Sequence, residues 1–212
     1  MTWIISFVSQ KGGVGKSTLS QLLSKAYVKN NFKVLLADMD VQQMSSCEWA
    51  LNGKANGVID LPDVKEFEHV KDVLTIKDQY DMVVFDGRPS ASAQTLEIAK
   101  ASDLIILPTS ASKYDMNPQI KLAHEFRSKN IEIKRIAFVF NRISTTKKNL
   151  ANAYDYISQT NYACLPVPIF QKTNYEQALE GGKALYETRS GSLNYKAADL
   201  LSAIAAILLK LN

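Results

Sequence analysis

Short apolar runs alternate along the chain with longer segments whose apolar residues recur at helical spacing. The apolar runs predict six buried strands, at residues 4–8, 33–37, 82–85, 104–107, 136–140 and 163–167. The helical spacing predicts helices at residues 16–30, 64–74, 91–101, 116–129, 146–159, 174–180 and 192–211. Strands that alternate with helices in this way form parallel βαβ units. The pattern therefore predicts an α/β fold with a doubly wound, mostly parallel sheet flanked by helices.

The chain shows no clear division into domains. Its clearest loop is at residues 52–57, and no linker rich in proline or serine occurs elsewhere. With 212 residues and a hydrophobic content of 46%, the chain is large enough to build a sizeable core. We expect one domain over residues 1–212.

Composition limits the cellular compartment and the binding partners that we expect for the protein. The first apolar run is a core strand and not a signal peptide, and we find no run of 18 or more uncharged apolar residues, so we expect a cytoplasmic protein. Cys47 and Cys164 lie far apart without metal-ligand spacing, which favours reduced structural thiols. A net charge of +4 and a pI near 8.9 allow weak contact with DNA or an acidic membrane but decide little.

The first predicted strand runs into a glycine-rich loop, Ser-Gln-Lys-Gly-Gly-Val-Gly-Lys-Ser-Thr, at residues 9–18. In such loops, glycines let backbone N–H groups surround a phosphate, a lysine reaches the outer phosphates, and a hydroxyl joins Mg²⁺. Gln10 departs from the usual pattern, which has glycine there, and Lys11 is a second lysine five residues before Lys16. The predicted nucleotide-binding residues of the loop are Gly12, Gly13, Val14, Gly15, Lys16, Ser17 and Thr18.

Three carboxylates follow predicted strands and are candidates for the same site, because ligands of open α/β sheets bind beyond the carboxyl ends of the strands. Asp86 follows the apolar residues 83–85 in a Walker B arrangement, in which an aspartate holds the Mg²⁺ shell. Asp38 and Asp40 lie two apart after the second strand, so both can face the phosphates, one toward the metal and one toward water. Asp40 is then a candidate to orient the attacking water, and Lys11 to compensate charge on the transferred group.

These segments together resemble one family. Residues 11–18, 38–42 and 83–86 are similar to those of the deviant Walker ATPases typified by ParA and MinD, and the resemblance extends over essentially the whole chain. Leu107-Pro108-Thr109 with Asp115, and the pair Asn141-Arg142, resemble later segments of the family. Residues 168–175, 180–182 and 186–187 resemble the C-terminal signature of short plasmid partition ATPases.

The resemblance implies a P-loop ATPase that binds ATP and Mg²⁺ and in which two subunits sandwich two ATP molecules, each inserting Lys11 into the site of its partner. It implies that Lys16 binds the β and γ phosphates, that Ser17, Asp38 and Asp86 serve the metal, and that Asp40 orients water. It also implies that Asn141, Arg142 and Pro168 contact adenine. The chain departs from the family pattern at Val41, at residues 87–89 and at Lys172, where an arginine is frequent.

Within the family, we interpret the chain as a ParA-type partition ATPase. It would bind DNA non-specifically as an ATP dimer on the nucleoid and hydrolyse ATP when a ParB-like or other small DNA-binding adaptor stimulates it. The candidate DNA-binding residues are Lys147, Lys148, Lys172, Lys183, Arg189 and Lys196. The alternatives are a MinD-like membrane-associated positioning ATPase and a protein-binding switch with negligible turnover. We expect no membrane binding, since the last helix has a broad apolar face but Lys210 as its only base after Lys196.

Overall fold

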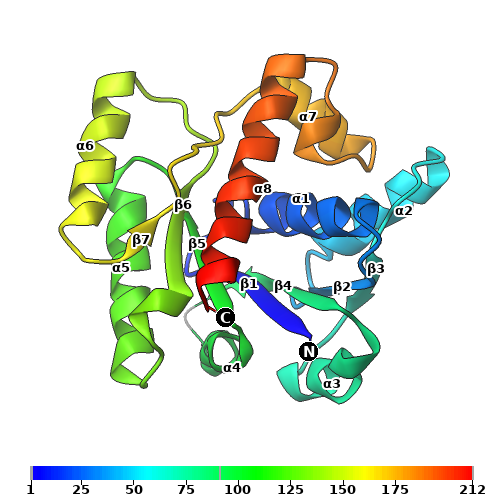
Figure 1. Cartoon of the computed structure of the whole chain (residues 1–212), viewed down its shortest axis with the longest axis horizontal. Helices are drawn as coiled ribbons and strands as arrows, with labels where there is room; N and C mark the ends of the chain where they lie inside the picture. The colour runs from blue at the N-terminus through cyan, green and yellow to red at the C-terminus, as the bar shows by residue number, and fades with distance from the viewer. Residues whose placement is uncertain (1, 91, 212) are drawn as a thin grey trace.

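The computed structural model describes residues 2–90 and 92–211, and in this part of the chain seven strands form one sheet in the order β3-β2-β4-β1-β5-β6-β7 (Figure 1). All adjacent strands are parallel. The strands are β1 (Trp3–Ser9), β2 (Val34–Asp38), β3 (Asp63–Glu66), β4 (Met82–Pro89), β5 (Leu104–Thr109), β6 (Ile136–Phe140) and β7 (Ala163–Cys164). The predicted doubly wound α/β fold is confirmed.

Helices cover both faces of the sheet, so its central strands are apolar on both sides. In β1, Ile4 and Val8 pack on one face, whereas Ile5 and Phe7 pack on the other. The first face carries α3 (Val70–Ile76), α4 (Ala93–Ala101), α5 (Lys113–Ser128) and α6 (Lys147–Ser158). The second face carries α1 (Lys16–Lys29), α2 (Ser45–Ala55), α7 (Thr173–Glu180) and α8 (Gly191–Leu211). Three short 3₁₀ helices are η1 (Lys77–Gln79), η2 (Ile133–Arg135) and η3 (Leu185–Glu187).

Two sequence expectations between β2 and β4 are wrong. The loop expected at residues 52–57 is mostly helix, because α2 continues to Ala55. The helix expected at residues 64–74 begins as strand β3, which pairs with β2, and α3 starts only at Val70. β3 is a largely exposed edge strand with charged residues, so it lacks the apolar alternation by which strands are recognised.

Three further boundaries differ from the predicted ones. β4 continues past Phe85 to Pro89, so Asp86 lies inside the strand, paired in register with Asp38 of β2. β7 ends at Cys164 and not at residue 167, and Pro166, which follows shortly after, has no N–H to donate to a ladder. The helix expected at residues 91–101 is α4, which begins at Ala93; residue 91 lies outside the described residues.

Helix α8 packs on the second face of the sheet through Ala197, Leu200, Ile204 and Leu208, which are buried at helical spacing. Among the described residues it is the one helix that is long and apolar enough, by length and composition alone, to cross a membrane. Core helices pass the same test, so this property does not by itself indicate a membrane span.

Candidate phosphate-binding site

The glycine-rich loop joins β1 to α1 at the carboxyl edge of the sheet. Gly13 and Gly15 have φ angles of +75° and +88°, in the left-handed region that favours glycine. A Cβ at Gly15 would also overlap the side-chain amide of Asn141. Helix α1 begins at Lys16, directly after the loop, so its free N–H groups and the positive end of its dipole face the loop. This is the local geometry that binds phosphate.

A polar cleft opens over this loop. Among the described residues, its lining comprises Gly12, Gly13, Gly15, Lys16, Ser17, Thr18, Gln21, Asp40, Gln43, Ser45, Gly87, Pro89 and Arg142. Lys16 is mostly buried, and its Nζ donates a hydrogen bond of 3.3 Å to the Lys11 carbonyl. Burial lowers the pKa of Lys16, and the nearby carboxylates of Asp86 and Asp40 partly offset that shift. A buried cation with one weak backbone partner is suited to bind an anionic ligand.

Asn141, Arg142 and Pro168 lie together at the end of β6. The Asn141 Nδ2 donates to the Val14 carbonyl at 3.0 Å, and the Arg142 guanidinium donates to the Gly13 carbonyl at 3.0 Å. The amide N–H of Ile169, next to Pro168, donates to the Phe140 carbonyl. Asn141 Oδ1 is buried and has no hydrogen-bond partner within the described chain. Asn141 and Arg142 therefore support the phosphate loop directly, a contact that the sequence did not predict.

Asp38 and Asp86 are buried side by side on β2 and β4 but have different partners. Asp38 accepts backbone N–H groups on both oxygens: Asp40 at 3.2 Å on Oδ1, and Ser46 at 2.9 Å and Cys47 at 3.2 Å on Oδ2. Asp86 accepts the Ser46 hydroxyl at 2.7 Å on Oδ2, whereas its Oδ1 has no partner in the part of the chain that is described. Asp38 thus anchors the start of α2, and Asp86 retains a free oxygen.

The environment of the two carboxyls raises both pKa values. Burial, together with the neighbouring Asp38, raises the pKa of Asp86 to about 7, although the hydroxyls of Ser17 and Ser46 and the charge of Lys16 act in the opposite direction. Burial also raises the pKa of Asp38, against the three backbone N–H groups that favour its charged form. A cation bound next to these two buried carboxyls would stabilise their ionised forms, so the position favours cation binding.

Asp40 lines the cleft, whereas Asp38 is not part of the lining. Its Oδ1 accepts the Gln43 N–H at 3.2 Å, and its carbonyl accepts the Met44 N–H at 2.8 Å, so the turn before α2 is built around it. Within this chain Asp40 thus lines the cleft, whereas the Asp38 carboxylate binds backbone N–H groups at the start of α2. The roles of both carboxylates toward metal and water remain predictions.

Lys11 lies outside this cleft lining, in contrast to Lys16. Its Nζ forms an ion pair of 2.7 Å with Asp115 Oδ1, and the Ser110 hydroxyl donates to Asp115 Oδ2 at 2.6 Å. Partial burial raises the pKa of Asp115, but the hydrogen bonds from Lys11 and Ser110 outweigh it and lower the pKa. Within one chain, Lys11 is thus held by the first turn of α5.

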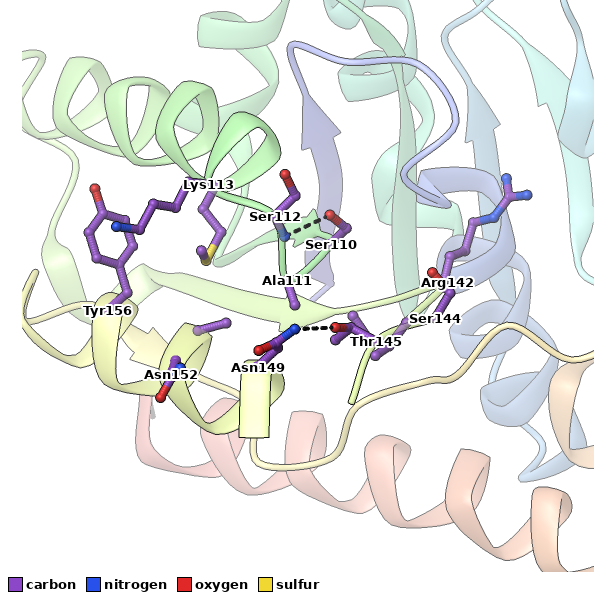
Figure 2. Close-up of a pocket in the computed structure, with 13 residues that line it drawn as sticks. Ser110, Ala111, Ser112, Lys113, Arg142, Ser144, Thr145, Asn149, Asn152 and Tyr156 are labelled. Atoms are coloured by element: carbon purple, nitrogen blue, oxygen red, sulfur yellow. Dashed lines mark hydrogen bonds between the residues drawn. The ribbon is translucent and has the colours of Figure 1, made fainter. Parts of the chain in front are cut away.

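A second cleft, with a mixed polar and apolar lining, lies beside the first, between the loops after β5 and β6 and helix α6 (Figure 2). It is lined on one side by Ser110, Ser112 and Lys113 and on the other by Thr145 and Asn149. Arg142 borders both clefts. The loop after β5, whose Ser110 hydroxyl donates to Asp115, therefore also forms one wall of this second cleft.

A family model described as the CobQ/CobB/MinD/ParA nucleotide binding domain matches residues 5–185. The chain belongs to this family. The match includes the phosphate loop, all three acidic residues and the Asn141 and Pro168 segments, and it confirms the ParA/MinD resemblance predicted from the motifs.

Proteins similar to this CobQ/CobB/MinD/ParA family member include an uncharacterised protein of Methanocaldococcus jannaschii, 25% identical over 87% of this chain and 90% of that protein. Similar structures include the cell division ATPase MinD of Pyrococcus furiosus, with a TM-score of 0.75, 18% identity and coverage of 97% and 99%. A proposed plasmid partition protein of Borrelia burgdorferi bound to AMPPNP has a TM-score of 0.73, 20% identity and the same coverage. At these identities the structures show a shared fold.

Two residues of the site were missed by sequence reasoning. Ser46 bridges Asp38 and Asp86 from the start of α2, and Gln21 of α1 donates to Ser46 Oγ at 3.3 Å. Gln21 lies one helical turn after Ser17, so its spacing was a usable signal. Ser46 lies in α2, a helix that the sequence pattern does not predict, so no spacing relates Ser46 to the other residues of the site.

Proposed function

We propose that the chain is a Mg²⁺-dependent ATPase of the partition type, which dimerises on ATP and binds DNA non-specifically to position a cargo. The observation that carries this proposal is the different placement of the two lysines. Lys16 lines the phosphate cleft, whereas Lys11 lies outside it and is held by Asp115. A lysine that does not serve its own cleft is available for the cleft of a second subunit.

The polar groups of the site fit Mg²⁺ and a nucleotide. Asp86 Oδ1, which has no hydrogen-bond partner in the described chain, and the Ser17 hydroxyl, which lies next to the Asp86 carboxyl, are the groups that would hold the metal shell, and Mg²⁺ would neutralise phosphate charge when bound. Asn141 Oδ1, buried and unpartnered within the described chain, is an acceptor suited to the amino group of adenine beside Pro168. Asp38, with both oxygens occupied, would act on the metal shell indirectly.

Dimer formation requires Lys11 to leave Asp115. The pair is partly exposed, with 39% and 28% of the two side chains accessible, so its net contribution is only about 0.2–1 kcal/mol. A triphosphate offers Lys11 several charges in a site that the second subunit shields from water, which favours exchange. We infer that ATP draws Lys11 across the interface and that its return to Asp115 accompanies dissociation.

Hydrolysis would depend on Asp40. Its carboxylate lines the cleft and is partly exposed, and one of its oxygens is committed to the Gln43 N–H. The second oxygen can accept a hydrogen bond from water and orient it toward the outermost phosphate. In this proposal an activating partner, ParB-like or another small adaptor, would act by ordering the turn between Asp40 and α2.

The candidate DNA-binding bases are all exposed but do not form one stripe. Lys147 and Lys148 begin α6 on the first face of the sheet. The other four, Lys172, Lys183, Arg189 and Lys196, lie around α7, η3 and α8 on the second face. We favour the second group for contact with DNA phosphates, since four bases on neighbouring elements can act together.

Measuring ATP-dependent dimerisation and ATPase activity tests the proposal. Lys16→Ala should abolish nucleotide binding, whereas Lys11→Ala should bind ATP as a monomer, measured by light scattering with a slowly hydrolysed analogue. Lys129→Ala, an exposed lysine at the far end of α5, is the matched control and should dimerise normally. Asp40→Ala should trap the ATP dimer. A normal dimer in Lys11→Ala, or unchanged turnover in Asp40→Ala, would contradict the respective role.

A MinD-like membrane role is the second candidate, favoured by the length and apolar composition of α8. Co-sedimentation with acidic liposomes and gel shifts with plain DNA, each with ATP and ADP at two salt concentrations, separate the two. We expect ATP-dependent, salt-sensitive binding to DNA and none to liposomes. The opposite result would replace the partition role by the membrane role.

A further inference from the structure

Ser46 connects the two buried carboxylates of the site. It is the second residue of α2 and is fully buried. Its backbone N–H donates to Asp38 Oδ2 at 2.9 Å, and its hydroxyl donates to Asp86 Oδ2 at 2.7 Å. No sequence motif marks this residue, and its contacts arise only where α2 meets the ends of β2 and β4.

The direction of the Ser46 hydroxyl follows from Gln21. The Gln21 Nε2 donates to Ser46 Oγ at 3.3 Å and also to the Ser45 carbonyl at 3.4 Å. Because a carbonyl can only accept, the Gln21 amide atom that contacts both groups is its nitrogen. Because Ser46 Oγ accepts from Gln21, its single hydrogen is directed to Asp86. The carboxyl of Asp86 is thereby held at Oδ2, and Oδ1 is the oxygen that remains without a partner in the described chain.

We propose that Ser46 is a positioning residue for the Mg²⁺ site, which sets the orientation of Asp86 so that Oδ1 serves the metal shell. The inference rests on the proposed Mg²⁺–ATP function. Groups that hydrogen-bond a metal-binding carboxylate typically change metal affinity by about 10–100-fold when removed. Ser46 therefore acts through Asp86 and not on ATP itself.

The role of the Ser46 hydroxyl in orienting Asp86 can be distinguished by mutation from a role in holding the start of α2. The start of α2 is anchored by the backbone N–H groups of Ser46 and Cys47 on Asp38, and these do not require a serine. Alanine keeps both N–H groups and favours a helix. Ser46→Ala thus removes the bond to Asp86 while it preserves the anchor of α2.

The test measures binding of a fluorescent ATP analogue to the full chain across a Mg²⁺ titration and in EDTA. For Ser46→Ala we expect the Mg²⁺ concentration at half-effect to rise by about tenfold or more, with affinity in EDTA within about twofold of wild type. Ser24→Ala is the matched control, since Ser24 is also a buried serine but its hydroxyl has no hydrogen-bond partner among the described residues. It should match wild type under both conditions.

Different failures have different meanings. Wild type without Mg²⁺-enhanced binding overturns the proposed function and this inference with it. If Mg²⁺ enhances binding to wild type but Ser46→Ala has the same Mg²⁺ concentration at half-effect, only the role of Ser46 is overturned. The same holds if Ser46→Ala weakens binding equally with and without Mg²⁺. If Ser46→Ala does not fold, Ser46→Cys keeps the size with a weaker donor and should give a smaller shift in the same direction. An unshifted, folded Ser46→Cys would also overturn it.

Discussion

Alanine substitutions at three glycines of the phosphate loop should destabilise the protein to three different extents. Gly12 has no positive φ, and a Cβ there would meet its nearest atom, Pro89 Cβ, at 3.9 Å, an ordinary contact. Gly13 has a φ of +75°, but a Cβ there would meet nothing within 4 Å. Gly15 has a φ of +88°, and its Cβ would overlap the Asn141 amide. The series separates backbone strain from steric overlap.

The expected magnitudes follow from these contacts. Gly12→Ala should change the free energy of unfolding by less than about 1 kcal/mol, because the unfolded chain also loses freedom. Gly13→Ala should cost about 1–2 kcal/mol for a left-handed alanine. Gly15→Ala should cost about 2–5 kcal/mol, since Asn141 must also move and give up its bond to Val14, leaving buried polar groups unpaired.

Urea denaturation of the nucleotide-free proteins, followed by circular dichroism, measures these differences directly. Nucleotide binding is the wrong assay for this purpose, because a methyl group in the loop can also obstruct the phosphate. The reasoning is refuted if Gly15→Ala is as stable as Gly12→Ala. Equal losses for Gly13→Ala and Gly15→Ala would show that Asn141 moves away at no cost and that strain alone matters.

Three further predictions concern other parts of the chain. Asp115→Asn should release Lys11 and strengthen ATP-dependent dimerisation by up to about fivefold per Lys11 freed, as measured by analytical ultracentrifugation. A weaker dimer would indicate instead that Asp115 stabilises the ATP-bound dimer. Gly182→Ala should lower thermal stability strongly, because its Cβ would overlap the Gly53 backbone, whereas Gly57→Ala, with a similar φ and open space, should lower it only mildly. Burial raises the pKa of Cys164 from 9.0 to about 12. At pH 8, iodoacetamide should therefore alkylate this thiol about 1000-fold more slowly than a thiol with the ordinary pKa. Rapid labelling would show that the thiol is accessible and ionised.

The predictions that succeeded rest on local patterns. Five of the six predicted strands, β1, β2, β4, β5 and β6, were recognised because the central strands of a parallel sheet are buried on both faces and read as apolar runs. The phosphate loop was recognised because its backbone conformation and its charge both depend on residues adjacent in sequence. β3 and α2 were missed because one is a charged edge strand and the other has almost no amphipathic pattern along its length.

The sequence by itself determined the fold class, the phosphate loop between β1 and α1, and the identity of the acidic residues near it, because each depends on short-range spacing. Only the tertiary structure decided what those residues touch. Asp38 binds the start of α2, Asp86 keeps one oxygen free, and Lys11 pairs with Asp115, 104 positions away. Such contacts depend on how strands pair and how helices pack across the sheet, and this arrangement leaves no periodic trace in the chain.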